Sequence, residues 1–271
     1  MRKKDSVMKK YIALLLALVM TFAMFACGKK EEAADSDLKY VKEKGTLVVG
    51  ITDFAPMDYQ DADGSWIGFD ADMAKAFAEK LGVEVKFQII DWDNKAFELE
   101  GKTIDVVWNG MTITDKVKAA MDCSNPYCNN QQIVIVKKDV ADQYQTKESV
   151  KDLKFAVEDG SAGQEQVTAL GAANITPVLD QATALNEVKA GTADAAVIDS
   201  LMAAAMVGEG TGYDDLTYTV GLNDEKYGVG FRKGSDMVEE LNKFFKEAWD
   251  NGTMMATAEK YGVQASVIEQ K

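Results

Sequence analysis

The feature of the sequence that most restricts its fold is a pattern that occurs twice. Gly101–Asp105 (GKTID) precedes one apolar run, and Gly191–Asp194 (GTAD) precedes another. Each pattern predicts a helix that ends at glycine, a short loop with an aspartate and then a buried strand. Five residues after each aspartate the apolar run ends, at Gly110 in one case and at Asp199 in the other. The chain is therefore expected to contain two similar α/β halves.

Both halves place polar groups at the carboxyl end of a predicted strand. In the stretch Ile104–Thr114 a β-branched apolar run reaches Asn109 and Gly110, and the hydroxyl groups of Thr112 and Thr114 follow. Open α/β sheets bind ligands at this end of their strands. Two such ends that face one another would form a cleft, a common place for a small-molecule site. An ordinary strand that ends in a surface loop is the alternative.

The first 26 residues are expected to be a lipoprotein signal peptide and not part of the fold. A basic leader, which can begin at Met1 or at Met8, precedes the apolar run Tyr11–Ala26, and this run is short for a membrane-spanning helix. Met24–Cys27 (MFAC) resembles the lipobox of bacterial lipoproteins, in which the cysteine is lipidated and becomes the mature N-terminus. An uncleaved anchor is the alternative. Residues 27–36 are charged and lack apolar periodicity, so they predict a tether.

Composition excludes several classes of function. The chain has no histidine, which excludes Ser-His-Asp and Cys-His catalysis and the commonest zinc-ligand sets. Without residues 1–26 it has 25 lysine and arginine residues against 43 aspartate and glutamate residues, a net charge near −18. Nucleic-acid binding favours basic patches, so we expect no nucleic-acid partner. The chain without the signal peptide and the tether, about 230 residues, suits one large domain or two small ones.

Local patterns predict further elements in both halves. Thr46–Ile51 (TLVVGI) is a predicted strand, and Phe69–Leu81 is a predicted amphipathic helix with Asp70 as its cap and Gly82 at its end. A long amphipathic helix over Ser235–Asn251 is expected to pack on the first half. The other predicted strands are Val83–Ile90, Gln132–Val136, Phe155–Val157 and Ala195–Ile198. The other predicted helices are Ser161–Leu170, Ala182–Lys189 and Ser200–Val207.

Several motifs in order resemble one known family. They are LVVGI…DFAPM, GSWIGFDADMAKAFAEKLGVEVKF, GKTIDVVWNGMTIT…DCSNPY, KDLKFAVEDGSAGQE, GTADAAVIDS and EKYGVGFRKGSD, between about Leu47 and Gly262. Together they are similar to the extracytoplasmic solute-binding proteins for polar amino acids, which are the receptors of ABC importers. The resemblance implies a two-lobed α/β fold of the periplasmic-binding-protein type II, with two crossover strands between the lobes. It places lobe 1 at residues 37–131 and 226–271, and lobe 2 at residues 132–225.

The resemblance also implies a function without catalysis. The chain would capture an amino acid, or a related small solute with an ammonium group, and deliver it to a permease. The expected protein is an extracytoplasmic monomer, anchored to the cell membrane by lipidated Cys27, with no cofactor and no metal. An enzyme on the same fold, similar to the cyclohexadienyl dehydratases, is the alternative, and it would need a carboxylic acid such as Asp70 or Glu158 in the cleft. A surface lipoprotein that binds only proteins is a third possibility, and it would leave Asp199 without a role.

The resemblance assigns ligand-binding residues of lobe 1 individually. Phe54 and Trp92 fall where the family has aromatic or apolar residues that cover the ligand, although both rings could be ordinary core residues. Gly110 matches a position that offers its carbonyl to the ligand ammonium. Thr112 matches a position that offers an N–H group and a hydroxyl to the ligand carboxylate.

Three residues of lobe 2 are assigned in the same way. Ser161 and Ala162, at a predicted helix start, match backbone donors to the ligand carboxylate, and helix starts favour anions. Asp199 matches the acid that pairs with the α-ammonium group. A strand-end aspartate that caps the next helix is the alternative for Asp199.

Val117 is the main departure from the family pattern. It stands where the family has an arginine that clamps the ligand α-carboxylate, and valine can make no such contact. Lys116 or Lys118 can substitute, but lysine carries a point charge and not a planar fork. We therefore expect looser recognition of the carboxylate.

Cys123 and Cys128 are the cysteines of the expected folded domain. In an exported chain this pair predicts a disulfide. Two buried free thiols that pack as small apolar residues are the alternative.

Overall fold

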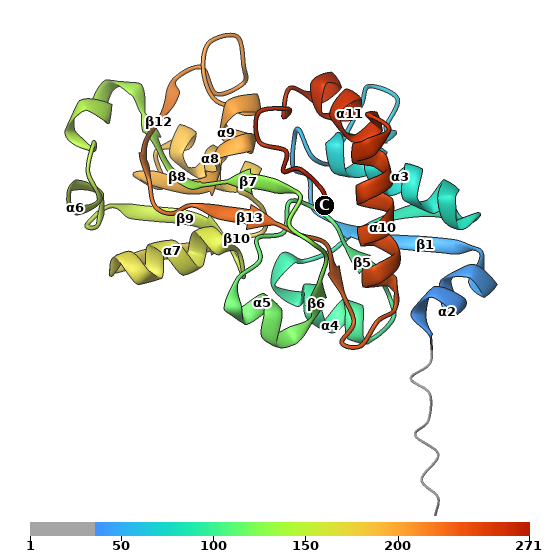
Figure 1. Cartoon of the computed structure of the whole chain (residues 1–271). Helices are drawn as coiled ribbons and strands as arrows, with labels where there is room; N and C mark the ends of the chain where they lie inside the picture. The colour runs from blue at the N-terminus through green and yellow to red at the C-terminus, as the bar shows by residue number, and fades with distance from the viewer. Residues whose placement is uncertain (1–35) are drawn as a thin grey trace, which may run out of the picture. The chain divides into compact units, whose positions relative to one another are not determined.

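The computed structural model describes residues 36–271, and every element named below lies within Asp37–Lys271 (Figure 1). The predicted signal peptide at 1–26, the lipidation site Cys27 and the predicted tether up to residue 35 lie outside the described residues. Within the described part of the chain, no helix has the length and apolar character needed to span a bilayer.

The first sheet has the strand order β4-β1-β5-β14-β6. The strand β1 (Thr46–Ile51) pairs in parallel with β4 (Glu84–Ile89) on one side and with β5 (Val106–Val107) on the other. Beyond β5, the strands β14 (Gly230–Phe231) and β6 (Asp122–Cys123) continue the sheet in antiparallel orientation. This sheet is therefore parallel at one edge and antiparallel at the other.

The second sheet repeats this arrangement, with the order β10-β9-β11-β8-β12. The strands β10 (Asn174–Val178), β9 (Lys154–Glu158) and β11 (Ala195–Asp199) are parallel. The strands β8 (Gln132–Lys137) and β12 (Leu216–Gly221) follow in antiparallel orientation. The structure thus has two α/β halves of similar topology, as the repeated sequence pattern predicts.

Helices cover both sheets (Figure 1). The elements that accompany the first sheet are α2 (Asp37–Lys44), α3 (Phe69–Leu81), η1 (Trp92–Asn94), α4 (Lys95–Glu100), α5 (Asp115–Ala120), α10 (Met237–Asp250), α11 (Thr253–Tyr261) and the short ribbon of β2 (Tyr59–Gln60) and β3 (Trp66–Ile67). Those that accompany the second sheet are η2 (Lys138–Gln143), α6 (Lys147–Val150), α7 (Ala162–Leu170), α8 (Gln181–Ala190) and α9 (Ser200–Met206).

Two short strands carry the chain between the sheets. β7 (Cys128–Asn130) and β13 (Glu225–Tyr227) pair with each other in antiparallel orientation and belong to neither large sheet. Figure 1 shows them side by side between the two groups of elements. Below, lobe 1 denotes residues 37–131 and 226–271, and lobe 2 denotes residues 132–225.

The helix α10 supplies much of the aromatic core of lobe 1. Five of its residues are buried: Met237, Leu241, Phe244, Phe245 and Ala248. The Phe245 ring lies 5.5 Å from the Trp108 ring in an edge-on arrangement, and the Phe244 ring lies 5.4 Å from the Phe77 ring. Such pairs add packing energy beyond their buried area. They fix α10 against α3 and against the end of β5, where the pocket begins.

Asp70 does not cap α3 as predicted. Gly68 occupies the N-cap position, and Asp70 is fully buried in the first turn. Its Oδ2 accepts hydrogen bonds from the Gly110 N–H and from the Tyr127 hydroxyl, both at 2.7 Å. Buried donors need acceptors, and Asp70 satisfies two of them at once. It therefore holds the loop after β5 in place.

The glycines of the repeated pattern differ in conformation. Gly191 ends α8 in the left-handed region with φ of 78°. Gly101 stays in the right-handed helical region with φ of −70°, and the following residue, Lys102, takes the left-handed conformation with φ of 59°. The first helix is therefore not closed by its glycine in the predicted way.

The aspartates of the repeated pattern have the same structural role. The Asp105 carboxylate accepts the Val48 N–H at 2.7 Å, and the Asp194 carboxylate accepts the Lys154 N–H at 2.9 Å. Each aspartate N–H also donates to the carbonyl of that same partner residue. Both ties fix a loop to the neighbouring parallel strand. Their surroundings differ, because Asp105 is buried beside the Lys44 ammonium, at 2.6 Å, whereas Asp194 is exposed.

Replacing these two aspartates by alanine should therefore have unequal effects on stability. Asp105→Ala removes the acceptor of the Val48 N–H and leaves the Lys44 ammonium unpaired, which should cost about 3–5 kcal/mol. Asp194→Ala removes one exposed acceptor and should cost about 1 kcal/mol. Urea unfolding of both variants measures the difference. Equal losses in the free energy of unfolding would show that burial does not distinguish the two sites.

The structure contains Cys123 and Cys128 as free thiols, so the predicted disulfide is not formed in it. The two residues belong to strands with different partners. Cys123 lies opposite Gly230 in the first sheet, and Cys128 lies opposite Tyr227 in the crossover pair. Cys128 is fully buried, and burial raises the pKa of its thiol well above the usual range. It packs as a small apolar residue, in line with the alternative.

Candidate functional site

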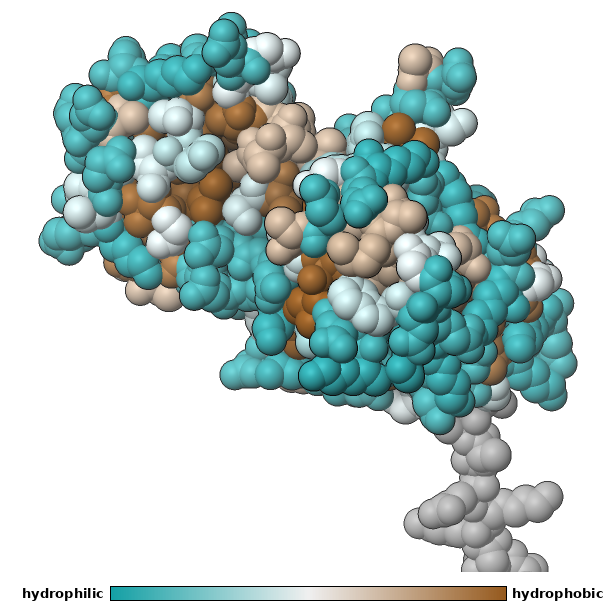
Figure 2. Space-filling model, turned by 45° about the horizontal axis from the view of Figure 1, so that its top comes forward, coloured by the Kyte–Doolittle hydropathy of each residue, from teal (hydrophilic) through white to brown (hydrophobic). Residues whose placement is uncertain are grey.

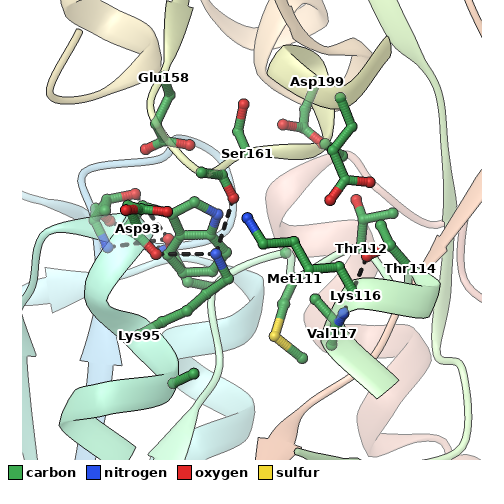
Figure 3. Close-up of a pocket in the computed structure, with 18 of the residues that line it drawn as sticks. Asp93, Lys95, Met111, Thr112, Thr114, Lys116, Val117, Glu158, Ser161 and Asp199 are labelled. Atoms are coloured by element: carbon green, nitrogen blue, oxygen red, sulfur yellow. Dashed lines mark hydrogen bonds between the residues drawn. The ribbon is translucent and has the colours of Figure 1, made fainter. Parts of the chain in front are cut away.

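A pocket lies between the two lobes and is lined by residues of both (Figure 3). Lobe 1 contributes the loops after β1 and β5 together with η1, α4 and α5. Lobe 2 contributes the ends of β9 and β11 and the starts of α7 and α8. All seven residues predicted to bind ligand lie around this pocket: Phe54, Trp92, Gly110, Thr112, Ser161, Ala162 and Asp199.

The lining of the pocket is typical of a small-molecule site. Apolar and aromatic side chains surround a small number of charged and polar groups. On the face that Figure 2 shows, hydrophobic residues occur in separate patches among hydrophilic ones. The pocket is therefore a better candidate for the functional site than that outer face.

The two predicted rings form part of the lobe 1 wall. Phe54 is buried and packs edge-on against Tyr227, with ring centroids 6.3 Å apart. Trp92 is also buried, and the Lys95 ammonium lies 4.7 Å from its ring centroid. The same ammonium donates to the Trp92 and Gly160 carbonyls, both at 2.9 Å. The Trp92 ring therefore makes a cation–π contact with Lys95 of the protein itself.

Gly110 is fixed from two sides. Its φ of 55° is left-handed, and a Cβ atom there would lie 2.4 Å from the Phe54 ring. Its N–H group donates to Asp70, as described above. Burial raises the pKa of Asp70 to about 7, against the lowering effect of the hydrogen bonds from Tyr127 and Gly110. The left-handed backbone and the nearby Phe54 ring thus favour glycine at this position. The same backbone conformation sets the direction of the Gly110 carbonyl.

Thr112 connects the pocket to a crossover strand. Its hydroxyl donates to the Glu225 carboxylate at 2.8 Å, and its backbone pairs with Tyr227. The Thr112 hydroxyl, predicted to donate to the ligand carboxylate, therefore donates its hydrogen bond to β13 in this structure.

Ser161 and Ala162 lie where the two lobes approach each other. The Ser161 hydroxyl oxygen accepts the Gln164 N–H at 3.1 Å and so caps α7, which begins at Ala162. The preceding Gly160 has φ of 68°, and a Cβ atom there would lie 2.6 Å from the Asp93 Cα of lobe 1. Glycine thus permits close contact between the lobes beside the start of α7.

Asp199 is the last residue of β11 and is surrounded by donors. Its Oδ1 accepts from Asn130 Nδ2 at 2.5 Å, Tyr227 hydroxyl at 2.6 Å and Gln132 Nε2 at 3.0 Å. Its Oδ2 accepts from Gln181 Nε2 at 2.6 Å. Asp199 occupies the N-cap position of α9, but its side chain makes no capping hydrogen bond. The capping alternative is therefore wrong for the carboxylate.

The pKa of Asp199 is raised to about 8. Burial is the largest cause, and the Glu225 carboxylate adds to it, while hydrogen bonds from Tyr227, Gln181 and Gln132 act in the opposite direction. A positive charge beside Asp199 would favour its ionised form.

Sequence reasoning missed the charged and amide residues that complete the pocket. They are Asp93, Lys95, Gln132, Glu165 and Gln181. It considered Glu158 only as the acid of the alternative enzyme, although Glu158 also lines the pocket. The sequence did contain a signal for Glu158 as a pocket residue. It is a charged residue at the end of an apolar strand, shortly before Gly160 and Ser161.

The structure distinguishes the two lysines near Val117. Val117 is buried and lines the pocket, and Lys116 lines it too. Figure 3 shows the Lys116 side chain extending from α5 toward the centre of the pocket. Lys118 instead forms an ion pair with Asp115 at 2.8 Å and borders a separate cavity. Lys116 and Lys118 were the two lysines expected to substitute for the arginine of the family pattern. Of these two, Lys116 lines the pocket.

The described residues include no cluster of three or more side chains suited to hold a metal ion. The donors and acceptors around the pocket are carboxylates, ammonium groups, amides and hydroxyls. Such a set can orient a small charged solute by hydrogen bonds and ion pairs.

Two α/β lobes, two crossover strands and a polar pocket at the strand ends define a class of binding proteins that hold a small molecule between lobes. The comparison with known sequences gives the family. The chain belongs to the bacterial extracellular solute-binding proteins, family 3, which it matches over residues 47–264.

Named relatives of this chain are amino-acid-binding proteins. It is 32% identical to the arginine-binding extracellular protein ArtP of Bacillus subtilis, over 94% of this chain and 98% of the relative. It is 32% identical to the L-cystine-binding protein TcyJ of Escherichia coli, over 90% of this chain and 92% of the relative. It is 30% identical to a probable histidine-binding protein of Neisseria gonorrhoeae, over 94% of this chain and 96% of the relative.

Solved structures agree with the fold. A mutant of ArgBP from T. maritima matches with a TM-score of 0.78 and 33% identity, over 83% of this chain and 99% of that one. A substrate-binding protein of an ABC uptake transporter from Streptococcus pneumoniae, with bound histidine, matches with a TM-score of 0.77 and 29% identity, over 84% and 97%. An ancestral amino-acid-binding protein, a precursor of cyclohexadienyl dehydratase, matches with a TM-score of 0.76 and 33% identity, over 83% and 99%.

Alanine at Gly110 should disturb the pocket more than alanine at another left-handed glycine. Gly64 has φ of 78°, and no described atom lies within 4 Å of the position that a Cβ atom would take there. Gly64→Ala should therefore cost only the left-handed strain, about 1–2 kcal/mol. Gly110→Ala adds the clash with Phe54, a further loss of about 1–3 kcal/mol. Urea unfolding measures both variants, and equal losses would mean that Phe54 moves aside freely.

Proposed function

We propose that this chain is the substrate-binding receptor of an ABC importer. It captures an amino acid, or a related small solute with an ammonium group, in the pocket between the lobes and delivers it to the permease. The observation that carries the proposal is Asp199, a buried carboxylate at the lobe 2 side of a pocket that lobe 1 residues complete.

In this proposal the ligand ammonium pairs with Asp199. The free side of Oδ2 and the Gly110 carbonyl are the acceptors that the ammonium would use. A charge-assisted contact of this kind is stronger than a neutral hydrogen bond. Because Asn130 and Tyr227 on the crossover strands also donate to Asp199, a bound ammonium would act on the strands that set the position of the lobes.

The ligand carboxylate has a less specialised partner. With Val117 in place of an arginine, the candidate contacts are the Lys116 ammonium, the Ser161 hydroxyl and the first N–H groups of α7. A lysine gives a point charge without the planar fork of arginine. Recognition of the carboxylate should therefore be weaker than recognition of the ammonium.

The named relatives support an amino acid as the ligand. Arginine-, L-cystine- and histidine-binding proteins all match this chain over most of its length. The ligands in these names differ from one another. The names therefore do not identify which amino acid this chain binds.

A second candidate function is an enzyme on the same fold. The observation that favours it is Glu158, a buried acid in the pocket whose pKa is raised to about 8, mainly by burial. An acid that stays protonated at neutral pH can donate a proton to a leaving group. The receptor remains the better-supported function, because the named relatives are binding proteins. Recovery of an unaltered ligand after incubation would separate the two.

The proposal includes an extracytoplasmic monomer held at the membrane. Cys27 would carry the lipid after removal of residues 1–26, and residues 27–36 would connect it to lobe 1. The extracellular character of the family supports the location.

The function can be tested with a thermal-shift screen of the purified chain against the standard amino acids. The ligand that stabilises the chain most should also reduce its radius of gyration in small-angle X-ray scattering. Asp199→Asn removes the ionic partner of the ammonium, and losing one partner of such a pair costs about 2–5 kcal/mol of binding free energy. N-acetylation of the ligand, which removes its charge, should abolish binding to the wild type. Unchanged affinity in both experiments would contradict the assigned role of Asp199.

A second experiment tests whether Lys116, and not Lys118, contacts the ligand carboxylate. Lys116→Gln should weaken binding of the free ligand about three- to tenfold, because one exposed charge-assisted contact is lost. It should leave the affinity for the carboxyl-amidated ligand unchanged. Lys118→Gln is the matched control, since this lysine pairs with Asp115 away from the pocket. Calorimetric titration of the wild type and both variants with the free and the amidated ligand gives all six affinities. An equal effect of Lys116→Gln on acid and amide would exclude a contact with the carboxylate.

A further inference from the structure

Glu158 is a buried carboxylate that faces the pocket without a full set of partners. It is the last residue of β9, it is 2% exposed, and Figure 3 shows its carboxylate turned toward the pocket. Its Oε1 accepts no hydrogen bond from the described residues. Buried polar atoms are nearly always hydrogen-bonded, so an unpartnered carboxylate oxygen at a pocket wall points to a ligand group as its partner.

The nearby cation is not that partner. The Lys95 ammonium lies on the lobe 1 side of the pocket and donates to the Trp92 and Gly160 carbonyls. Among the described residues, no ion pair within 4.0 Å joins Lys95 to Glu158. Lys95 thus orders the contact between the lobes and leaves Oε1 of Glu158 available.

The charged groups that face Glu158 come from three elements. Asp199 at the end of β11 and Asp180 before α8 raise the pKa of Glu158, while Lys95 of α4 lowers it. Burial is the largest cause, and the resulting pKa is about 8. At neutral pH the carboxyl group in these surroundings is therefore mostly protonated, and a positive charge beside it would make it ionise.

We propose that Glu158 accepts a second positively charged group of the ligand, so that the pocket selects solutes with two ammonium or guanidinium groups, such as basic amino acids. The inference rests on the proposed function, because Asp199 is taken to hold the first ammonium group. It adds a residue and a chemical class of ligand to that function.

The sheet geometry places the two carboxylates within reach of one small molecule. The strands β9 and β11 are parallel neighbours with Val157 opposite Val197. Glu158 lies one residue beyond this pair and Asp199 two residues beyond. With strands about 4.8 Å apart and a rise of about 3.3 Å per residue, their Cα atoms are about 6 Å apart. Gln181 bridges the two sites, since it hydrogen-bonds Asp199 directly and also interacts with Glu158.

The proton balance follows from this arrangement. A ligand that is already positively charged brings no extra proton for Glu158. When its second cationic group enters, the Glu158 carboxyl group loses its proton to solvent, and the new carboxylate pairs with that cation. A ligand of the same shape with a neutral end would leave Glu158 protonated. Binding of the two should therefore differ by about one released proton near pH 7, given the Glu158 pKa of about 8.

The test compares charged ligands with neutral isosteres. The probes are L-arginine with L-citrulline and L-lysine with L-norleucine, titrated calorimetrically into the full-length chain in mild detergent. We expect at least one charged probe to bind about thirtyfold or more tightly than its isostere, as contacts between buried opposite charges give. In Glu158→Gln this ratio should fall to about fivefold or less, the level of a neutral hydrogen bond.

Asp159→Asn provides the matched control. It makes the same exchange of an acid for its amide one residue further along, at an exposed position outside the pocket. It should leave the ratio of charged to neutral ligand unchanged. If Glu158→Gln fails to fold, proton release from the wild type decides instead, through titrations at pH 7 in buffers of different ionisation enthalpy. The charged probe should then release about one proton more than its isostere.

The outcomes separate this inference from the proposed function. If neutral amino acids bind as tightly as their charged counterparts, or if the ratio persists in Glu158→Gln with equal proton release, then the role of Glu158 is wrong and the receptor stands. If neither the standard amino acids nor other small solutes with an ammonium group bind the wild type, the proposed function itself fails.

Discussion

The hydrogen bonds that converge on Asp199 join the pocket to the crossover strands, and the arrangement of the lobes depends on them. Asn130 of β7 and Tyr227 of β13 donate to Oδ1 at 2.5 and 2.6 Å, while Gln181 at the start of α8 donates to Oδ2 at 2.6 Å. These contacts bring together the two connections between the lobes and one wall of the site. A ligand that changes the charge of Asp199 therefore acts on the crossover strands directly, without a chain of intermediate residues. Lobe 1 has a corresponding support in Asp70, which holds Gly110 at the opposite side of the pocket.

The buried acids around the site are stable in their neutral forms. Burial is the largest cause of the raised pKa values of Asp58, Asp70, Glu158 and Asp199, and the last three reach about 7, 8 and 8. A raised pKa in the folded state means that the group contributes stability below its unfolded pKa, near 4, and that this contribution is lost as the pH rises toward 7 or 8. Without a cation beside them, ionisation of these acids thus opposes folding. A cationic ligand reverses this at Glu158 and Asp199, because it supplies the opposite charge that burial removes from solvent.

Local signals in the sequence predict the elements, and long-range contacts decide what their polar residues do. The predicted bounds of Thr46–Ile51 and Phe69–Leu81 equal those of β1 and α3, since a β-branched run and an apolar periodicity closed by Gly82 are local features. The role of Asp70 could not be predicted, because its partners Gly110 and Tyr127 lie 40 and 57 residues away. The same holds for the pocket. Its seven predicted residues come together because strand ends meet at one edge of a sheet, whereas the burial of Glu158 beside the exposed Asp159 depends on how α8 and lobe 1 pack around it.

The resemblance implies an arginine where this chain has Val117. Its absence and the proposed role of Glu158 would shift ligand recognition in the same direction. Among the described residues that line the pocket, the carboxylates are Asp93, Glu158, Glu165 and Asp199, and the ammonium groups are Lys95 and Lys116. Lys95 is bonded to backbone carbonyls, so Lys116 alone remains for a ligand anion, and it is exposed, where an ion pair contributes little. The carboxylates Glu158 and Asp199 are buried, where a charge without a partner costs most. Because Lys116 is exposed whereas Glu158 and Asp199 are buried, the positive groups of a zwitterionic ligand should contribute more binding free energy than its carboxylate. If Asp199 and Glu158 act as proposed, the pocket discriminates among solutes chiefly by the number and position of their positive groups.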